Sequence, residues 1–215
     1  MASLKEYLFY EEPGIQLYCG DCREVLPFLP SSDLVLTDPP YGIGLKYESY
    51  NDTPENWRLL MEFIIPHIKT RSQMGIMPCC RIVELPWIYK TFPPDWLMAW
   101  HKGSPGTSAW TGFNDWEPLL VYGKVDGIQM HDYLSVHPEP FTNGHPCPKP
   151  LKWATWIIER ASFAGHTILD PFMGSGTTLR ASKDLGRKAI GVEIEPKYCE
   201  LAVKRLRQEV LPLGG

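Results

Sequence analysis

The residues Asp38-Pro39-Pro40-Tyr41 directly follow an apolar run, Leu34 to Thr37, and their chemistry suits a site for an amine. An amino group conjugated to an aromatic ring is a poor nucleophile, because its lone pair is delocalised into the ring. Two acceptors, each of which receives a hydrogen bond from one of its N–H groups, free that lone pair and stabilise the transition state. Asp38 supplies one acceptor and a backbone carbonyl, which we assign to Pro39, supplies the other. The prolines stiffen the turn and remove N–H donors, and Tyr41 offers a ring that can stack on a base.

Asp-Pro pairs also initiate ordinary turns, so the tetrapeptide alone does not identify a site. A second motif, Asp170-Pro-Phe-Met-Gly-Ser-Gly-Thr-Thr178, favours the functional interpretation. Gly174 and Gly176 allow close approach of a ligand to the backbone and positive φ angles. A helix expected over Thr177 to Leu185 presents free N–H groups that favour an anion, which we take to be the carboxylate of a small cofactor. Leu179 stands where a dinucleotide fingerprint requires a third glycine, which argues against a dehydrogenase.

Acidic residues follow or end four apolar runs, each of which predicts a strand. The runs and their acids are Ile15 to Cys19 with Asp21, Leu34 to Thr37 with Asp38, Thr167 to Asp170 with Asp170, and Ala189 to Val192 with Glu193. Because parallel sheets bind ligands at the carboxyl ends of their strands, we expect these four acids to gather there. Glu193 is suited to a ribose diol; Glu195 is the competing candidate, and strand alternation favours Glu193. A helix over Tyr198 to Val210 is expected only to pack.

In this order the motifs resemble those of the β class of S-adenosylmethionine-dependent DNA amino-methyltransferases, a circularly permuted class in which the catalytic motif precedes the cofactor motif. Matching motifs cover residues 15–44 and 110–207. The resemblance implies that the catalytic residues are Asp38, Pro39, Pro40 and Tyr41. It implies that S-adenosyl-L-methionine is bound by Asp21, Cys22, His145, Lys149, Asp170, Phe172, Gly174, Ser175, Gly176, Thr177, Thr178 and Glu193. Among these, Asp21 resembles the acceptor for the cofactor's adenine, and the segment His145 to Pro150 resembles the element that closes over its methionine end.

The resemblance also implies a substrate, the N6 amino group of adenine in double-stranded DNA, flipped out of the helix. Aspartate at position 38 usually accompanies N6-adenine in these families, and serine more often accompanies N4-cytosine. The two amines share one geometry, so N4-cytosine stays open as the alternative, as does RNA. Methylation of protein glutamine is disfavoured because its enzymes carry asparagine at that position. A rival class is a non-catalytic cofactor-binding or DNA-binding subunit, against which the intact Asp-Pro-Pro-Tyr argues.

The fold class that these elements predict is α/β: one doubly wound, Rossmann-like domain over residues 1–215 with a mostly parallel sheet and permuted motif order. An antiparallel hairpin is expected between the strand at Trp96 and the strand Trp116 to Lys124, and the polar stretch Lys46 to Pro54 is expected to be a mobile loop. The target-recognition insert near 125–144 is very short, since only 20 residues separate Lys124 from His145. We expect a short recognition sequence or little specificity, with dimerisation or a partner supplying further DNA contacts.

Composition sets the remaining expectations. The net charge is −4 and the pI about 5.9, so contacts to phosphates should be few. Cys19 and Cys22 have the C-x-x-C spacing without a second pair, which predicts reduced thiols and no metal. We find no signal peptide and no run long enough for a bilayer, so we expect a cytoplasmic protein without membrane contact. Trp110 lies in a glycine-rich loop, where it either packs or meets a flipped base.

Overall fold

A computed structural model gives the structure of residues 3–79, 82–103, 108–109, 112–113, 115–138 and 149–208. Its strands are β1 (Leu8–Glu12), β2 (Ile15–Cys19), β3 (Ser32–Leu36), β4 (Ser72–Pro78), β5 (Trp96–His101), β6 (Ser108–Ala109), β7 (Gly112–Phe113), β8 (Trp116–Gly123), β9 (Tyr133–Ser135), β10 (Thr167–Asp170) and β11 (Lys188–Glu193). Its α-helices are α1 (Leu4–Tyr7), α2 (Cys22–Val25), α3 (Pro54–Arg71), α4 (Leu85–Thr91), α5 (Leu151–Ala161), α6 (Thr177–Asp184) and α7 (Pro196–Arg207). Two 3₁₀ turns, Leu26–Phe28 and Ile82–Glu84, complete the described elements.

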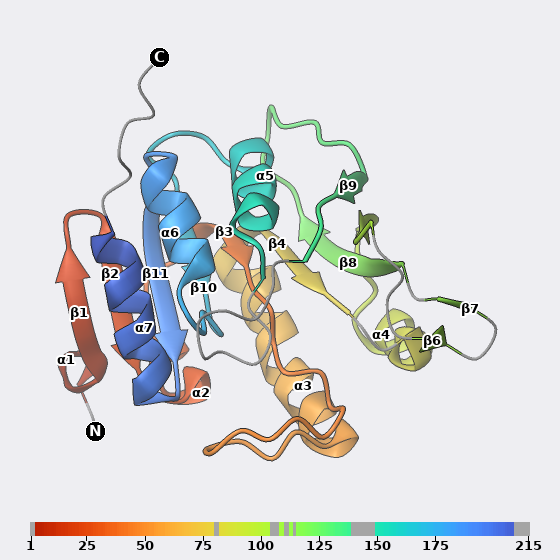
Figure 1. Cartoon of the computed structure of the whole chain (residues 1–215), viewed down its shortest axis with the longest axis horizontal. Helices are drawn as coiled ribbons and strands as arrows, with labels where there is room; N and C mark the ends of the chain where they lie inside the picture. Colours follow the sequence, from red (N-terminus) through yellow and green to blue (C-terminus); the bar gives the residue numbers. More distant parts are fainter. Residues whose placement is uncertain are drawn as a thin grey trace.

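One nine-stranded sheet in the order β1-β2-β11-β10-β3-β4-β8-β5-β9 forms the centre of the molecule (Figure 1). The five strands β2, β11, β10, β3 and β4 are mutually parallel, whereas β8 runs antiparallel to both β4 and β5. The mostly parallel α/β fold and the antiparallel hairpin predicted from the sequence are therefore confirmed. The permuted order is visible in the sheet, because the last two strands of the chain lie between β2 and β3.

Helices cover both faces of this sheet, as Figure 1 shows. On one face α3 packs with Val35 of β3, and Trp57, Met61 and Ile64 of the helix are buried there. On the other face Leu34 of β3 packs with α5, while α6 and α7 cover β11 and β2. Neighbouring residues of one strand thus belong to different cores, which is the period-two alternation of a strand buried on both sides.

The helices begin and end close to their predicted bounds. The helix expected from Tyr198 begins two residues earlier, because Pro196 fits the first helical turn, where its missing N–H costs nothing. It ends at Arg207 rather than at Val210, since Gln208 takes an extended conformation. Within the described residues, none of the helices is both long enough and apolar enough to cross a membrane.

The segment of residues 42–52, which overlaps the stretch Lys46 to Pro54 predicted to be a mobile loop, carries its own set of hydrogen bonds. The buried Asp52 carboxylate accepts from the backbone N–H groups of Gly42, Ile43 and Leu45 at 2.6, 3.1 and 3.1 Å. The N–H of Gly44 donates to the Asp52 carbonyl at 2.8 Å. We refer to residues 42–52 as the flap; its shape is set by one aspartate that the sequence analysis left unremarked.

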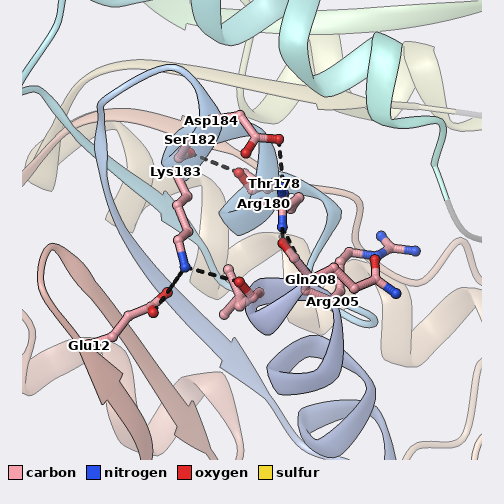
Figure 2. A network of polar contacts seen from close by, with 9 residues as sticks. Glu12, Thr178, Arg180, Ser182, Lys183, Asp184, Arg205 and Gln208 are labelled. Carbon is pink, nitrogen blue, oxygen red and sulfur yellow. Dashed lines mark hydrogen bonds and ion pairs between the residues drawn. The ribbon is translucent and has the colours of Figure 1, made fainter. Parts of the chain in front are cut away.

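A buried arginine joins α6, the helix that begins at the end of the cofactor motif, to the end of α7. The Arg180 side chain, on α6, donates to the backbone carbonyls of Arg205 and Gln208 at 3.0 and 2.5 Å and to the Asp184 carboxylate at 2.9 Å (Figure 2). Lys183 adds a bond to Glu12 on β1 at 2.8 Å. These bonds fix α6 against α7 and β1.

Candidate active site

The four acids predicted to gather at strand ends all line one pocket, at the edge where β2, β11, β10 and β3 end. The pocket is partly open to solvent and extends from Asp21, after β2, to Trp153 on α5. The predicted site residues that line it are Asp21, Cys22, Asp38, Pro39, Pro40, Tyr41, Lys149, Asp170, Phe172, Gly174, Ser175, Thr177, Thr178 and Glu193. Gly176 does not line it, and His145 lies outside the described residues, as does Trp110.

Gly176 has a steric role at the start of α6. Its φ is +79°, and a Cβ placed on it would lie 2.8 Å from the Cβ of Ala202 on α7. No other residue fits between these helices without moving one of them. Gly174, with φ of +51°, instead turns the backbone so that its N–H points to a carboxylate of the pocket.

Asp170, at the end of β10, is buried and held by neutral donors. One carboxylate oxygen accepts from the Thr37 hydroxyl at 2.7 Å and from the N–H of Phe172 at 3.1 Å. Burial raises the pKa of Asp170 to about 6, against the lowering effect of hydrogen bonds from Thr178, Thr37 and Phe172. Thr37 therefore ties the catalytic strand to the cofactor strand.

Glu193, at the end of β11, is held by backbone amides. Its two oxygens accept from the N–H groups of Gly174 at 3.0 Å and Glu195 at 2.9 Å. Burial raises the pKa of Glu193 to about 7, again against those hydrogen bonds. The competing candidate Glu195 does not line the pocket; it is 2% exposed and accepts from the N–H of Ser49 at 2.7 Å, fastening the flap to the start of α7.

Asp38 is held by charged and phenolic partners. Its carboxylate lies 2.7 Å from the Lys149 ammonium and accepts from the Tyr41 hydroxyl at 2.5 Å. Lys149 also donates to the Tyr41 hydroxyl at 2.7 Å and lies 5.1 Å from the centre of the Tyr41 ring. The three side chains form a closed triad. Lys149, for which the resemblance implies a role at the methionine end of the cofactor, thus contacts the catalytic motif.

Asp21 caps α2 and is paired with Arg23. Its carboxylate accepts from the backbone N–H of Arg23 at 2.8 Å and lies 2.5 Å from the Arg23 guanidinium. Partial burial raises the pKa of Asp21, but the hydrogen bonds and charge of Arg23 outweigh it, and the pKa lies below its usual value. Burial raises the pKa of the neighbouring Cys22 thiol. Among the described residues no group of three or more His, Cys, Asp or Glu is arranged to hold a metal ion.

The pocket fits S-adenosylmethionine by the chemistry of its lining. That molecule carries an ammonium group, two ribose hydroxyls and an adenine amine as donors, and the pocket offers the carboxylates of Asp170, Glu193 and Asp21 as acceptors. Two further lining side chains have buried polar atoms without a partner among the described residues, the hydroxyl of Tyr50 and the indole N–H of Trp153. Such atoms are rare in folded proteins unless a ligand or water pairs with them.

Sequence reasoning missed several residues of the pocket: Arg23, Tyr47, Tyr50, Trp153, and Tyr198. Tyr50 belongs to the flap and Trp153 to α5, neither of which carries a recognisable motif. Tyr198 stands on α7, for which only packing was predicted. An aromatic residue shortly after a motif is the weak signal that could have pointed to Tyr50.

Comparison with known proteins agrees with this geometry. Residues 93–204 match the family model described as DNA methylase. The type II methyltransferase M2.LlaDCHI of Lactococcus lactis subsp. cremoris is 41% identical over 93% of this chain and 92% of its own length. The DNA adenine methyltransferase YhdJ of Escherichia coli (strain K12) is 27% identical over 87% of this chain and 81% of its own length.

Two solved structures share the fold. The M1.HpyAVI–SAM complex superposes with a TM-score of 0.69 at 24% identity, covering 90% of this chain and 100% of the other. The PvuII DNA methyltransferase (cytosine-N4-specific) superposes with a TM-score of 0.69 at 16% identity, covering 92% of this chain and 88% of the other. At these identities the likeness establishes the fold and leaves the choice of base open.

Proposed function

The chain belongs to the DNA methylase family, with S-adenosylmethionine as methyl donor, and we propose that it methylates the N6 amino group of adenine in double-stranded DNA. The observation that carries this proposal is the place of Asp38. Its carboxylate lines the same pocket as the buried carboxylates of Asp170 and Glu193, so an amine held by Asp38 lies beside the cofactor.

Asp38 performs the step at the amine. It accepts one N–H of the target amine, and the carbonyl of Pro39 accepts the other, so that the lone pair is free to attack. The bound cofactor supplies a methyl group activated by the positive charge on its sulfur. For the amine to reach Asp38, Tyr41 or Lys149 gives up its present bond to that carboxylate, and the Tyr41 ring is then free to stack on the flipped base.

Nucleoside analysis decides which base is modified. Unmethylated DNA is incubated with the protein and S-adenosylmethionine, digested and examined by mass spectrometry. We expect N6-methyladenine, in line with the aspartate at position 38 and with a relative named as a DNA adenine methyltransferase. N4-methylcytosine alone would refute adenine while leaving the DNA methylase reaction intact. Matched duplex, single-stranded and RNA oligonucleotides in the same assay identify the nucleic acid.

The rival function, a non-catalytic cofactor-binding or DNA-binding subunit, is separated by one variant. Asp38→Ala removes the acceptor for the amine N–H. Incorporation of labelled methyl groups by the natural protein, lost in Asp38→Ala, supports catalysis at this site. Absence of incorporation from every DNA offered, with the cofactor still bound, favours the rival.

We further propose that sequence recognition is short or weak. The insert is short, and part of it packs into the core: Leu134 in β9 is buried against the sheet edge, and Val125, Ile128 and Val136 pack into the same core. A segment of this length carries few side chains that can read base edges, each of which contributes about 1–3 kcal/mol of discrimination. Sequencing a methylated plasmid for modified bases tests this; a strict motif of six or more base pairs made by a monomer contradicts it.

A homodimer is the simplest source of the missing DNA contacts. With a net charge of −4, one protomer offers few phosphate contacts. We expect light scattering to find a dimer, and a salt series to show shallow dependence of DNA affinity. DNA and the methyl donor are both cytoplasmic, so we propose the same location for the protein, with no membrane partner and no metal requirement.

A further inference from the structure

The flap places a phenol inside the cofactor pocket. Tyr50 lines the pocket, and its hydroxyl oxygen is buried without a hydrogen-bond partner among the described residues. The Tyr50 ring packs edge-on against Tyr47, with the ring centres 6.3 Å apart. The backbone N–H of Ser49, the residue before it, donates to Glu195. The ring contact and the backbone contact together fix the position of the Tyr50 side chain.

The surroundings of Tyr50 locate it at one end of the pocket. The charged and polar groups that act on its hydroxyl are Asp52, Arg23, Cys22 and Asp21, the last three of which also line the pocket. Burial, followed by the charge of Asp52, raises the pKa of Tyr50 to about 12. The hydroxyl consequently keeps its proton at neutral pH and acts as a donor.

The end of the pocket near Asp21 is where the adenine of the cofactor is expected, with its amino group donating to that carboxylate. The purine ring also carries nitrogens that only accept hydrogen bonds. A buried hydroxyl without a partner destabilises the protein, and an acceptor on a ligand removes that cost. We propose that Tyr50 donates a hydrogen bond to a ring nitrogen of the cofactor's adenine.

This assignment rests on the proposed function, because it requires the chain to bind S-adenosylmethionine. It gives the flap a part in binding, since the same segment follows directly from the Asp-Pro-Pro-Tyr motif and is fastened to α7 through Glu195. Tyr50 is thus a specificity-determining residue for the adenine ring, in addition to Asp21.

The test is the variant Tyr50→Phe, with Tyr89→Phe as the matched control, since Tyr89 is 48% exposed on α4 outside the pocket. Calorimetry with S-adenosylhomocysteine should give a Kd about fivefold higher for Tyr50→Phe and unchanged for the control. Without ligand, Tyr50→Phe should melt at the same temperature as the natural protein or higher, because the lost hydroxyl has no partner to lose.

Analogues of S-adenosylhomocysteine that lack one ring nitrogen identify the acceptor. With the 1-deaza, 3-deaza and 7-deaza compounds, one analogue should bind the natural protein and Tyr50→Phe equally, because the acceptor is already absent. Three results would each overturn the assignment. The Tyr50→Phe substitution could raise the Kd by the same factor for all three analogues, or leave the Kd of S-adenosylhomocysteine unchanged. The unliganded variant could also melt at a lower temperature than the natural protein. Failure of the natural protein to bind any of these ligands would instead reject the proposed function.

Discussion

The two ends of the pocket hold their carboxylates in different ways. At the cofactor end, Asp170 and Glu193 are 3% and 9% exposed, and their partners are backbone N–H groups and threonine hydroxyls. At the base end, the Asp38 side chain is 24% exposed and its partners are the Lys149 ammonium and the Tyr41 phenol. Backbone donors cannot move without unfolding a turn, whereas side chains can rotate away. We therefore expect the cofactor end to be complete before binding, and the base end to exchange partners when a base enters.

The largest expected effect lies at the base end. Asp38→Ala should lower the rate of methyl transfer by about a thousandfold or more, because the acceptor of the amine proton is lost. The affinity for S-adenosylmethionine should stay within about twofold, since Asp38 is predicted to contact the base and not the cofactor. Radiolabelled methyl transfer and calorimetry measure the two quantities, with Glu159→Ala, at an exposed residue of α5 outside the pocket, as control. A loss of cofactor affinity in Asp38→Ala would mean that Asp38 also takes part in binding the cofactor.

At the cofactor end, Glu193→Ala should weaken binding of S-adenosylmethionine by about 1–3 kcal/mol, because a charged hydrogen bond to the ribose is lost. Glu200→Ala serves as the control, since Glu200 is exposed on α7 and does not line the pocket. Methyl transfer by Glu193→Ala should recover at saturating cofactor. If instead the rate stays low at saturation, Glu193 acts on the reaction and not only on binding.

Lys149 tests the difference between the two ends of the pocket. The resemblance places it at the methionine end of the cofactor, whereas the structure places it beside Asp38. If it positions Asp38, Lys149→Ala lowers the maximal rate about tenfold, and Lys149→Arg recovers part of that loss. The Kd of S-adenosylmethionine then stays nearly unchanged in both variants. A Kd that rises in step with the loss of activity would assign Lys149 to the cofactor end.

The smallest expected effect is a dependence on pH. Folding raises the pKa of Glu193 from 4.5 to about 7, so the folded protein binds this proton more tightly than the unfolded chain does. The free energy of unfolding of the unliganded protein should therefore fall as the pH rises across that interval. Hydroxyls of the bound cofactor donate to the ionised form, so cofactor affinity should rise by about fivefold between pH 6 and pH 8. Melting curves and calorimetry at several pH values measure both slopes, and Glu193→Gln should flatten them. Equal slopes in the natural protein and Glu193→Gln would assign the titration to another group, such as Asp170.

The cofactor end could be predicted from the sequence and the partners at the base end could not. Asp21, Asp38, Asp170 and Glu193 each end or follow an apolar run, and parallel strands bring their carboxyl ends to one edge, so local pattern and topology sufficed. The pairing of Lys149 with Asp38 depends on where the start of α5 meets β3, which no local pattern encodes. Tyr50 was missed for a related reason, because the flap has neither helical nor strand periodicity and is shaped by the single carboxylate of Asp52.

The place of β10 and β11 in the sheet has a consequence during synthesis of the chain. They lie between β2 and β3 in the sheet, yet they follow all the other described strands in the chain. Until they are synthesised, β2 and β3 each lack a neighbour on one side, which leaves an edge unpaired. At about 5–20 residues per second, the wait from Leu36 to Glu193 lasts on the order of ten seconds. Exposed edges of this kind invite pairing with other chains, so this part of the nascent protein is where we expect chaperones to act. A chain released before Glu193 would lack the strands that join β2 to β3, so we expect it not to form a smaller version of this sheet.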